Sequence, residues 1–342
     1  MSKMKILKDI RSKYPNEFVL FGIFVFLFVV MSILSPDKFL SITNLQTMLF
    51  QMPEFGLMAL AMMIAVLTGG MNLSIITGST LATIIAGFFM RTEFVQNNPA
   101  LGTLLAVLMT IFIACMTGVL NGAIVAYIGV APMLVTLGTK TLFEGLGLQF
   151  TKGSSVSGFP ELFNKIGSGT LFGIPYTLII LIIFTVLSYF LFERSKWGME
   201  VYMIGCNETA TRFSGVNTKA TLLKVYIYSG LMYGIAGILI ASRYCSAKTD
   251  YGSSYLMQAL TAVVLGGTSI AGGSGTVAGT ILAVMIIQTV STGFNIYGIN
   301  RNIVNIITGV ILIVVLAIRY LTQVVIDRKK IRERVSQSRK TA

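Results

Sequence analysis

The chain has 342 residues, of which 54% are hydrophobic and only 11% are charged, and its net charge is +13. A soluble domain usually carries about 25% charged residues, so this composition excludes the soluble classes and predicts an all-α, polytopic membrane protein. The absence of histidine excludes histidine-based catalysis, and the three scattered cysteines form no zinc or redox spacing. We therefore expect neither an enzyme nor a metal site.

Apolar runs along the chain predict about ten transmembrane helices, because a helix of about 20 residues crosses the bilayer core. No long polar block remains for a soluble domain, so residues 1–342 are expected to form a single transmembrane domain. The first run follows a basic segment but no small-x-small cleavage pattern, which predicts a retained helix. The runs lie at about 17–34, 45–67, 73–90, 101–127, 132–150, 176–192, 220–241, 254–265, 276–291 and 302–318.

Basic residues gather in three segments that flank the spans: a tail at 1–16, a loop at 193–219 and a tail at 319–342. The positive-inside rule places all three in the cytoplasm, so both termini are predicted to be cytoplasmic. No basic stripe interleaved with aromatic residues is present, so the expected partner is the lipid membrane and not a nucleic acid.

Two glycine pairs form an internal repeat. Gly69-Gly70 and Gly266-Gly267 are each followed, after seven residues, by another glycine, and the two sites align at an offset of 197 residues. Glycine-interrupted segments at corresponding positions indicate the substrate path of a transporter. The repeat is parallel if every run crosses the membrane and inverted if one run is re-entrant, and the sequence leaves both arrangements open.

Such glycine turns are candidate solute contacts. Backbone that leaves helical geometry inside a bilayer is tolerated only against protein or a water-filled cavity, and the free N–H groups of the next half-helix suit a neutral, hydroxyl-rich ligand. The alternative interpretation is close helix packing through small residues. We assign thirteen residues to the substrate path: Gln51, Glu54, Gly69, Gly70, Asn72, Ser74, Asn121, Thr136, Glu144, Gly266, Gly267, Thr268 and Asn295.

Ionisable residues within the spans are few. Glu54 is either functional or close to the outer surface, and Lys140 and Glu144, four residues apart on one helix face, are either functional or a structural ion pair. Transporters driven by ion gradients usually need an acidic residue deep in the membrane. The scarcity of such residues disfavours a self-powered transporter.

The cytoplasmic loop contains a predicted short helix. Asn207 can cap it, Glu208 lies in its first turn, and Gly215 can end it. Arg212 and Phe213 would then be presented to a cytoplasmic partner, or the helix would simply lie on the lipid surface. No G-x-x-x-x-G-K-[ST] pattern occurs in the chain, so ATP would have to be bound by another subunit.

The chain resembles the permease subunits of ribose/galactoside-type ABC importers over about residues 40–318. Residues 205–216 resemble the family's "G-x-N-x-x-A-A-R-x-S-G-I" loop, and residues 263–275 resemble its "V-V-L-G-G-T-S-L-x-G-G-x-G" stretch. Residues 68–74, 121–122 and 132–139 resemble "T-G-G-I-D-L-S", "N-G" and "P-F-I-x-T-L-G-T".

This resemblance implies a ten-helix permease in the bacterial inner membrane that pairs as a homodimer or heterodimer. It also implies two cytoplasmic ATPase subunits that bind the ATP, so the permease needs no cofactor, and an extracytoplasmic solute-binding protein. The family's ATPase-coupling loop corresponds here to Gly205, Asn207, Ala210, Arg212, Phe213, Ser214 and Gly215.

Two departures from the family pattern concern the expected solute contacts. Asn72 replaces the usual acidic residue, and Glu144 stands where the family often has arginine. We expect an importer of a monosaccharide or a related polyol or furanose. The alternatives are an importer of a nucleoside, an autoinducer or a branched-chain amino acid from the same superfamily, or a self-contained secondary transporter.

Overall fold

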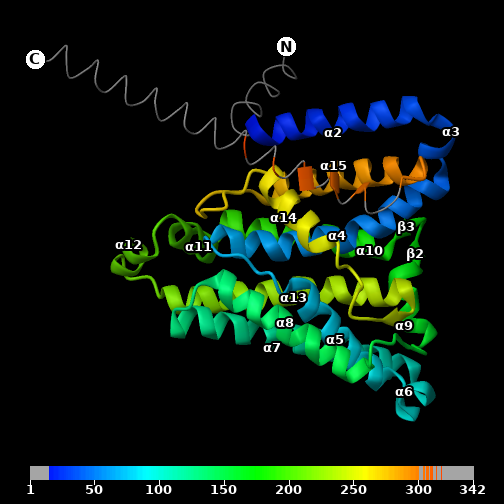
Figure 1. The fold of residues 1–342 in the computed structure, drawn as a ribbon, viewed down its shortest axis with the longest axis horizontal. Coiled ribbons are helices and arrows are strands. Elements are labelled where there is room, and N and C mark those ends of the chain that lie inside the picture. Colours follow the sequence, from blue (N-terminus) through cyan, green and yellow to red (C-terminus); the bar gives the residue numbers. More distant parts are fainter. Residues whose placement is uncertain are drawn as a thin grey trace, which may run out of the picture.

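A computed structural model of the chain describes residues 15–299 and positions 303, 304, 306, 307, 309, 310, 313 and 317. These residues form a bundle of helices that run along the long axis of the molecule (Figure 1). The helices of the bundle are α2 (Pro15–Leu34), α4 (Ile42–Leu67), α5 (Ile75–Met90), α7 (Pro99–Ala123), α8 (Pro132–Thr151), α10 (Tyr176–Tyr189), α13 (Thr218–Tyr244), α14 (Tyr255–Leu265) and α15 (Val277–Ile296).

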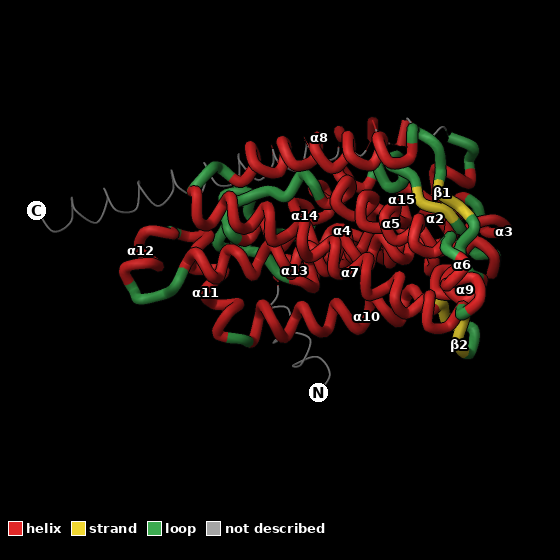
Figure 2. Tube along the Cα trace, turned by 90° about the horizontal axis from the view of Figure 1, so that it is seen from below, coloured by secondary structure: helices red, strands yellow, loops and turns green. Residues whose placement is uncertain are grey.

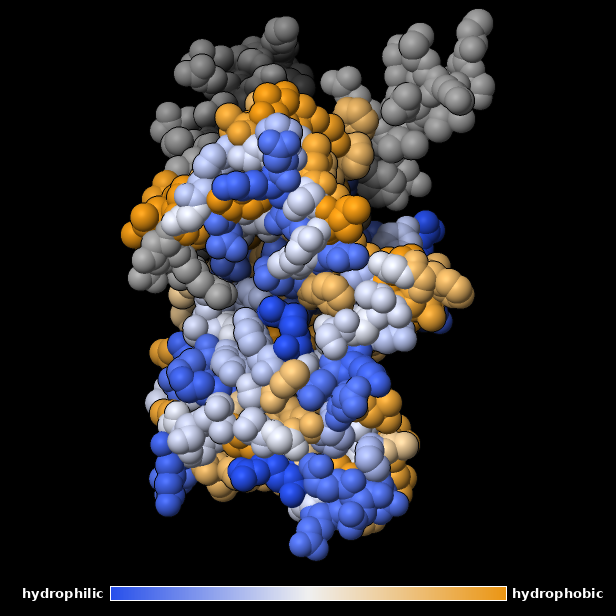
Figure 3. Space-filling model, turned by 90° about the vertical axis from the view of Figure 1, so that its right-hand side faces the viewer, coloured by the Kyte–Doolittle hydropathy of each residue, from blue (hydrophilic) through white to orange (hydrophobic). Residues whose placement is uncertain are grey.

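The two ends of the bundle differ. One end, which we call the α12 end, carries α11 (Lys196–Cys206) and α12 (Glu208–Phe213), and α12 protrudes from it (Figure 1). The opposite end, which we call the α9 end, presents hydrophilic residues at its centre and hydrophobic ones along its flanks (Figure 3). Its elements are α3 (Pro36–Phe39), α6 (Glu93–Asn97), α9 (Glu161–Ser168), β1 (Val156–Ser157), β2 (Thr170–Leu171), β3 (Ile174–Pro175) and β4 (Ser246–Ala247).

Short strands and π-helical turns complete the described elements. β1 pairs antiparallel with β4, and β2 pairs antiparallel with β3. The π-helices η1 (Ile124–Ile128) and η2 (Phe190–Arg194) extend α7 and α10, and η1 ends at Gly129, whose φ of +83° suits glycine. Pro132 then starts α8, as the sequence predicts.

The core lies on α4 and α13. All residues of α4 from Pro53 to Leu67 are buried, as is most of α13, because a helix that is apolar all round is stable only inside a protein or a membrane. In contrast, α2, α7 and α10 leave large apolar side chains exposed, for example Phe26, Phe112 and Ile183. Such faces fit contact with lipid.

Six described helices are long and apolar enough to cross a membrane: Asn16–Leu34, Ile42–Leu67, Pro99–Ile128, Tyr176–Arg194, Thr218–Tyr244 and Val277–Ile296. Two shorter apolar helices, α5 and α14, accompany them. The polytopic all-α prediction is thus confirmed, while the count of ten stays a prediction. The tenth predicted span, 302–318, and the basic tails lie largely or wholly outside the described residues.

Candidate functional site

The two glycine turns, 197 residues apart in sequence, lie against each other. The first follows α4 and the second follows α14, and a Cβ atom placed on Gly272 would lie 2.6 Å from the backbone nitrogen of Gly69. The Gly273 nitrogen also donates a hydrogen bond of 3.0 Å to the Leu67 carbonyl. The two turns of the repeat therefore meet in the folded chain.

The last turn of α11 packs onto this junction. A Cβ atom on Gly205 would lie 2.0 Å from the Leu67 carbonyl oxygen and 2.4 Å from the Gly273 nitrogen. Tyr202, one turn earlier, donates a hydrogen bond of 2.9 Å to the Gly275 carbonyl, and burial raises its pKa to about 12, so the phenol stays neutral. We call this backbone contact between residues 67–69, 205 and 272–273 the glycine junction.

The predicted helix in the loop after α11 is confirmed. The Asn207 side chain accepts a hydrogen bond of 2.9 Å from the Ala210 nitrogen, α12 ends at Phe213, and Gly215 has a φ of +86°. Arg212 is exposed and the Phe213 side chain is 82% exposed. The tip of the protruding helix therefore presents the cation and the aromatic ring that the sequence predicts there.

Three of the predicted path residues form a buried polar network. The Asn72 Oδ1 accepts a hydrogen bond of 2.8 Å from the Ser74 hydroxyl, and the Asn121 Nδ2 donates one of 2.8 Å to that hydroxyl. Thr139 donates to the Asn121 Oδ1 at 2.7 Å. Asn72, Ser74 and Asn121 are fully buried, so in this conformation the network joins α5, α7 and α8 and does not face open space.

The amide at position 72 explains one departure from the family pattern. Its Nδ2 donates to the Ser229 hydroxyl at 3.1 Å, and Ser229 in turn donates to the Ala61 carbonyl at 2.8 Å. A carboxylate has no hydrogen to donate, so an aspartate could not keep its bond to Ser229 while Ser229 donates to Ala61, and it would bury a charge. Thr136, another predicted path residue, donates to the Met71 carbonyl at 2.8 Å and ties α8 to the first glycine turn.

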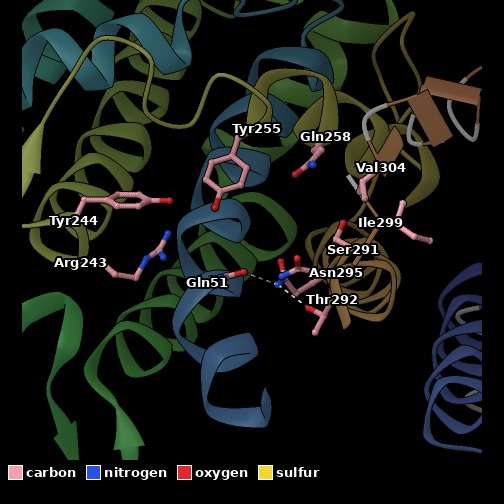
Figure 4. Close-up of a pocket in the computed structure, with 11 residues that line it drawn as sticks. Gln51, Arg243, Tyr244, Tyr255, Gln258, Ser291, Thr292, Asn295, Ile299 and Val304 are labelled. Carbon is pink, nitrogen blue, oxygen red and sulfur yellow. Dashed lines mark hydrogen bonds between the residues drawn. The ribbon is translucent and has the colours of Figure 1, made fainter. Parts of the chain in front are cut away.

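A polar cavity of about 160 Å³ is lined by residues of α4, α13, α14 and α15 (Figure 4). Two predicted residues, Gln51 and Asn295, line it. The other lining residues are Arg243, Tyr244, Tyr255, Gln258, Gln288, Ser291, Thr292, Ile299 and Val304. Amide and hydroxyl groups dominate, which gives donors and acceptors for a neutral ligand.

One face of α15 supplies much of this lining. Gln288, Ser291, Thr292 and Asn295 stand at positions i, i+3, i+4 and i+7, which share one side of a helix. The Gln288 Nε2 donates to Gln51 at 3.4 Å and to Thr292 at 3.2 Å, shown as dashed lines in Figure 4. This polar stripe in an apolar helix is visible in the sequence at helical spacing, but only Asn295 of it is among the predicted path residues.

Glu54 lies behind the cavity wall, and its side chain is fully buried. Its carboxylate binds Arg243 in two places, from Nε to Oε1 at 2.5 Å and from Nη2 to Oε2 at 2.8 Å. Tyr255 donates a third hydrogen bond of 3.3 Å to Oε2. The guanidinium also lies 4.5 Å from the centre of the Tyr244 ring.

Glu144 lies apart from the network and the cavity, exposed on the outer face of α8. Of the two alternatives for Lys140 and Glu144, the ion pair does not form in the part of the chain that the structure describes. The three predicted residues of the second turn lie together. Gly266 and Thr268 pack against Gly279 and Gly275, and Gly267 has a φ of +105°.

Comparison with known proteins identifies similar chains over most of the length. Residues 44–316 match the family described as "Branched-chain amino acid transport system / permease component". The chain is 34% identical to the ribose import permease protein RbsC of Bacillus subtilis, over 90% of this chain and 91% of that one. It is 32% identical to the autoinducer 2 import system permease protein LsrD of Photorhabdus temperata, again over 90% and 91%. No solved structure matches the chain.

Proposed function

Because this chain belongs to the family of branched-chain amino acid transport system permease components, we propose that it is the membrane permease subunit of an ATP-driven importer for a monosaccharide or a related polyol or furanose. The family is a transport family and not an enzyme family. Bacterial relatives and several long apolar helices place the chain in the inner membrane.

The observation that carries this proposal is the connection between α12 and the glycine junction. An exposed segment at one end is joined, through Gly205, to the turns that end α4 and α14. A push on α12 by partner ATPases would therefore reach both hairpins, and α4 and α14 continue from there to the polar cavity. We place the α12 end and both termini in the cytoplasm, and a solute-binding protein at the α9 end.

The solute class follows from the cavity together with the relatives. Apart from one neutralised arginine, its described lining offers amides, hydroxyls and apolar groups, which suits a sugar better than a zwitterionic amino acid. The relatives named for autoinducer 2 make that solute the second candidate. The test is ATP-dependent uptake of labelled ribose by proteoliposomes holding the permease, its ATPase and its binding protein, with autoinducer 2 and leucine as competitors. Uptake by this chain alone under an ion gradient would overturn the proposal.

Reversing the charge of the exposed docking segment should uncouple the importer. We expect Arg212→Glu to lower uptake and solute-stimulated ATP hydrolysis at least about tenfold, because like charges across an interface are strongly disfavoured. Both rates are measured in proteoliposomes. Lys196→Glu is the control, since Lys196 is exposed at the same end but precedes the protruding segment. Wild-type rates in Arg212→Glu would refute the docking assignment.

The outer face of α8 is the proposed contact with a second permease subunit. This helix runs along one long side of the molecule (Figure 2), and a Cβ atom on Gly138 or Gly145 would meet nothing within 4 Å. Glu144 is exposed on the same helix, and a charge facing lipid is costly. Small residues permit close helix contact, so a second permease would cover this face.

Cross-linking in a cysteine-free background tests this contact. Thr141→Cys, on the exposed face of α8, should form a disulfide-linked dimer in membranes under mild oxidation. Leu104→Cys, on the exposed face of α7, should stay monomeric on a non-reducing gel. If this chain pairs with a different permease, that partner is given a matching cysteine, and the cross-linked product then has the summed mass of the two subunits. The absence of a cross-linked product at α8 with either partner would exclude this face.

A further inference from the structure

The polar cavity contains one charged lining residue among those described, Arg243. The other lining side chains are neutral at physiological pH. An arginine in such a place ordinarily attracts carboxylates and phosphates, because its planar fork matches their two oxygens. Its state therefore decides which charge of solute the cavity accepts.

Glu54 occupies the fork that an anionic solute would use. The carboxylate holds Nε and Nη2 of Arg243 at 2.5 and 2.8 Å and is itself inaccessible to solvent, with 0% exposure. Tyr255 anchors Oε2 from the other side and stacks on Phe55, the residue next to Glu54, with ring centres 5.8 Å apart. The carboxylate is therefore held by three hydrogen bonds and cannot swing away from the guanidinium.

A guanidinium has five N–H donors, of which Glu54 takes two. Neither bond to Glu54 uses Nη1, so the arginine still has donors for a hydroxyl oxygen. The pair thus offers hydrogen bonds without net charge. This combination suits a polyhydroxylated, uncharged molecule.

We propose that Glu54 is a specificity-determining residue, which cancels the charge of Arg243 so that the cavity accepts neutral polyhydroxylated solutes and disfavours sugar acids and sugar phosphates. This inference rests on the proposed function for the identity of the cargo. The cancellation of the Arg243 charge by Glu54 can be measured without a transport assay.

The measurement is the ratio of the labelling rates of two thiol reagents with the same reactive group but opposite charge, each rate divided by that reagent's rate with a free thiol in solution. All three native cysteines are replaced, and S291C places one thiol in the cavity wall. The anionic methanethiosulfonate MTSES and the cationic MTSET are then compared on the full-length protein. In E54Q, the unpaired arginine should raise the MTSES/MTSET ratio at least about tenfold, since one charge at close range acts on the two reagents with opposite sign.

Three further variants sharpen the test. E54D keeps the charge and should keep the wild-type ratio. E161Q removes a carboxylate that is 84% exposed on α9, and it should also leave the ratio unchanged. The double variant E54Q/R243Q removes both charges and should return the ratio to the wild-type value, even where E54Q alone folds poorly, because neutral replacement of a buried pair is far better tolerated than loss of one partner.

An unchanged ratio in E54Q would overturn the inference. A ratio in the double variant far below that of the wild type would also overturn it, because the wild-type cavity would then carry the positive charge of Arg243 despite Glu54. Protection of the introduced thiol against labelling by D-ribose and by D-ribonate tests the solute specificity. D-ribonate should protect the thiol better in E54Q than in the wild type. If ribose uptake fails while the labelling ratios behave as expected, the proposed cargo is wrong and the charge cancellation stands.

Discussion

Gly205→Ala should separate ATP hydrolysis from solute uptake. A methyl group on Gly205 would lie 2.0 Å from the Leu67 carbonyl oxygen, well inside van der Waals contact, and the atoms around it are backbone that cannot rotate away. The end of α11 must therefore move off the glycine junction. The exposed surface of α12 is not touched, so ATPase docking should persist.

We expect uptake per ATP hydrolysed to fall at least about tenfold in Gly205→Ala, measured in proteoliposomes with the partner ATPase and binding protein. Gly22→Ala is the matched control, because a Cβ atom on Gly22 meets nothing within 4 Å. Co-purification of the ATPase distinguishes lost coupling from lost docking. A wild-type ratio of uptake to ATP hydrolysis in Gly205→Ala would show that the glycine junction does not transmit the movement of α12 to the transmembrane helices.

Asn121→Leu, a substitution of similar side-chain volume, should destabilise the chain. The change removes the bonds to Ser74 and Thr139, at 2.8 and 2.7 Å, and leaves both hydroxyls with fewer partners in a fully buried network. An unsatisfied buried polar group costs about 1–3 kcal/mol, so a total loss of about 3 kcal/mol is expected. Thermal unfolding in detergent should show a Tm several degrees lower.

Asn98→Leu, the same change at the exposed start of α7, is the control and should cost less than about 0.5 kcal/mol. Thr139→Val tests the network itself. Because Asn121 and Thr139 share one hydrogen bond, the double variant should lose less than the sum of the two single losses. Strict additivity would mean that the two side chains act independently.

Local features of the fold were readable from the sequence because they depend on neighbouring residues. Long apolar runs predict membrane helices, and the structure places helices on the nine predicted runs that fall within residues 15–299. Asn207 followed by Glu208 predicts a capped helix, and α12 forms there. The matched spacing after the glycine pairs predicts two equivalent turns.

The candidate site was only partly predictable, because its partners are distant in sequence. Glu54 and Arg243 are 189 residues apart, and no feature of the sequence around either residue identifies the other as its partner. Asn72 and Asn121 were assigned to a solute path, whereas the structure brings them into a hydrogen-bonded network without open space. Their role in transport stays a prediction.

The composition and spacing of this chain by themselves determined a polytopic helical membrane protein with a capped helix in its basic loop and a duplicated glycine turn, because periodicity, capping and lipid solubility are local properties. Only the tertiary structure decided that the two turns touch each other and α11, that Glu54 neutralises Arg243, and that one face of α15 lines a polar cavity. These contacts arise because buried polar groups and exposed backbone must find partners across helices inside an apolar medium, and the choice of partner depends on how the helices pack.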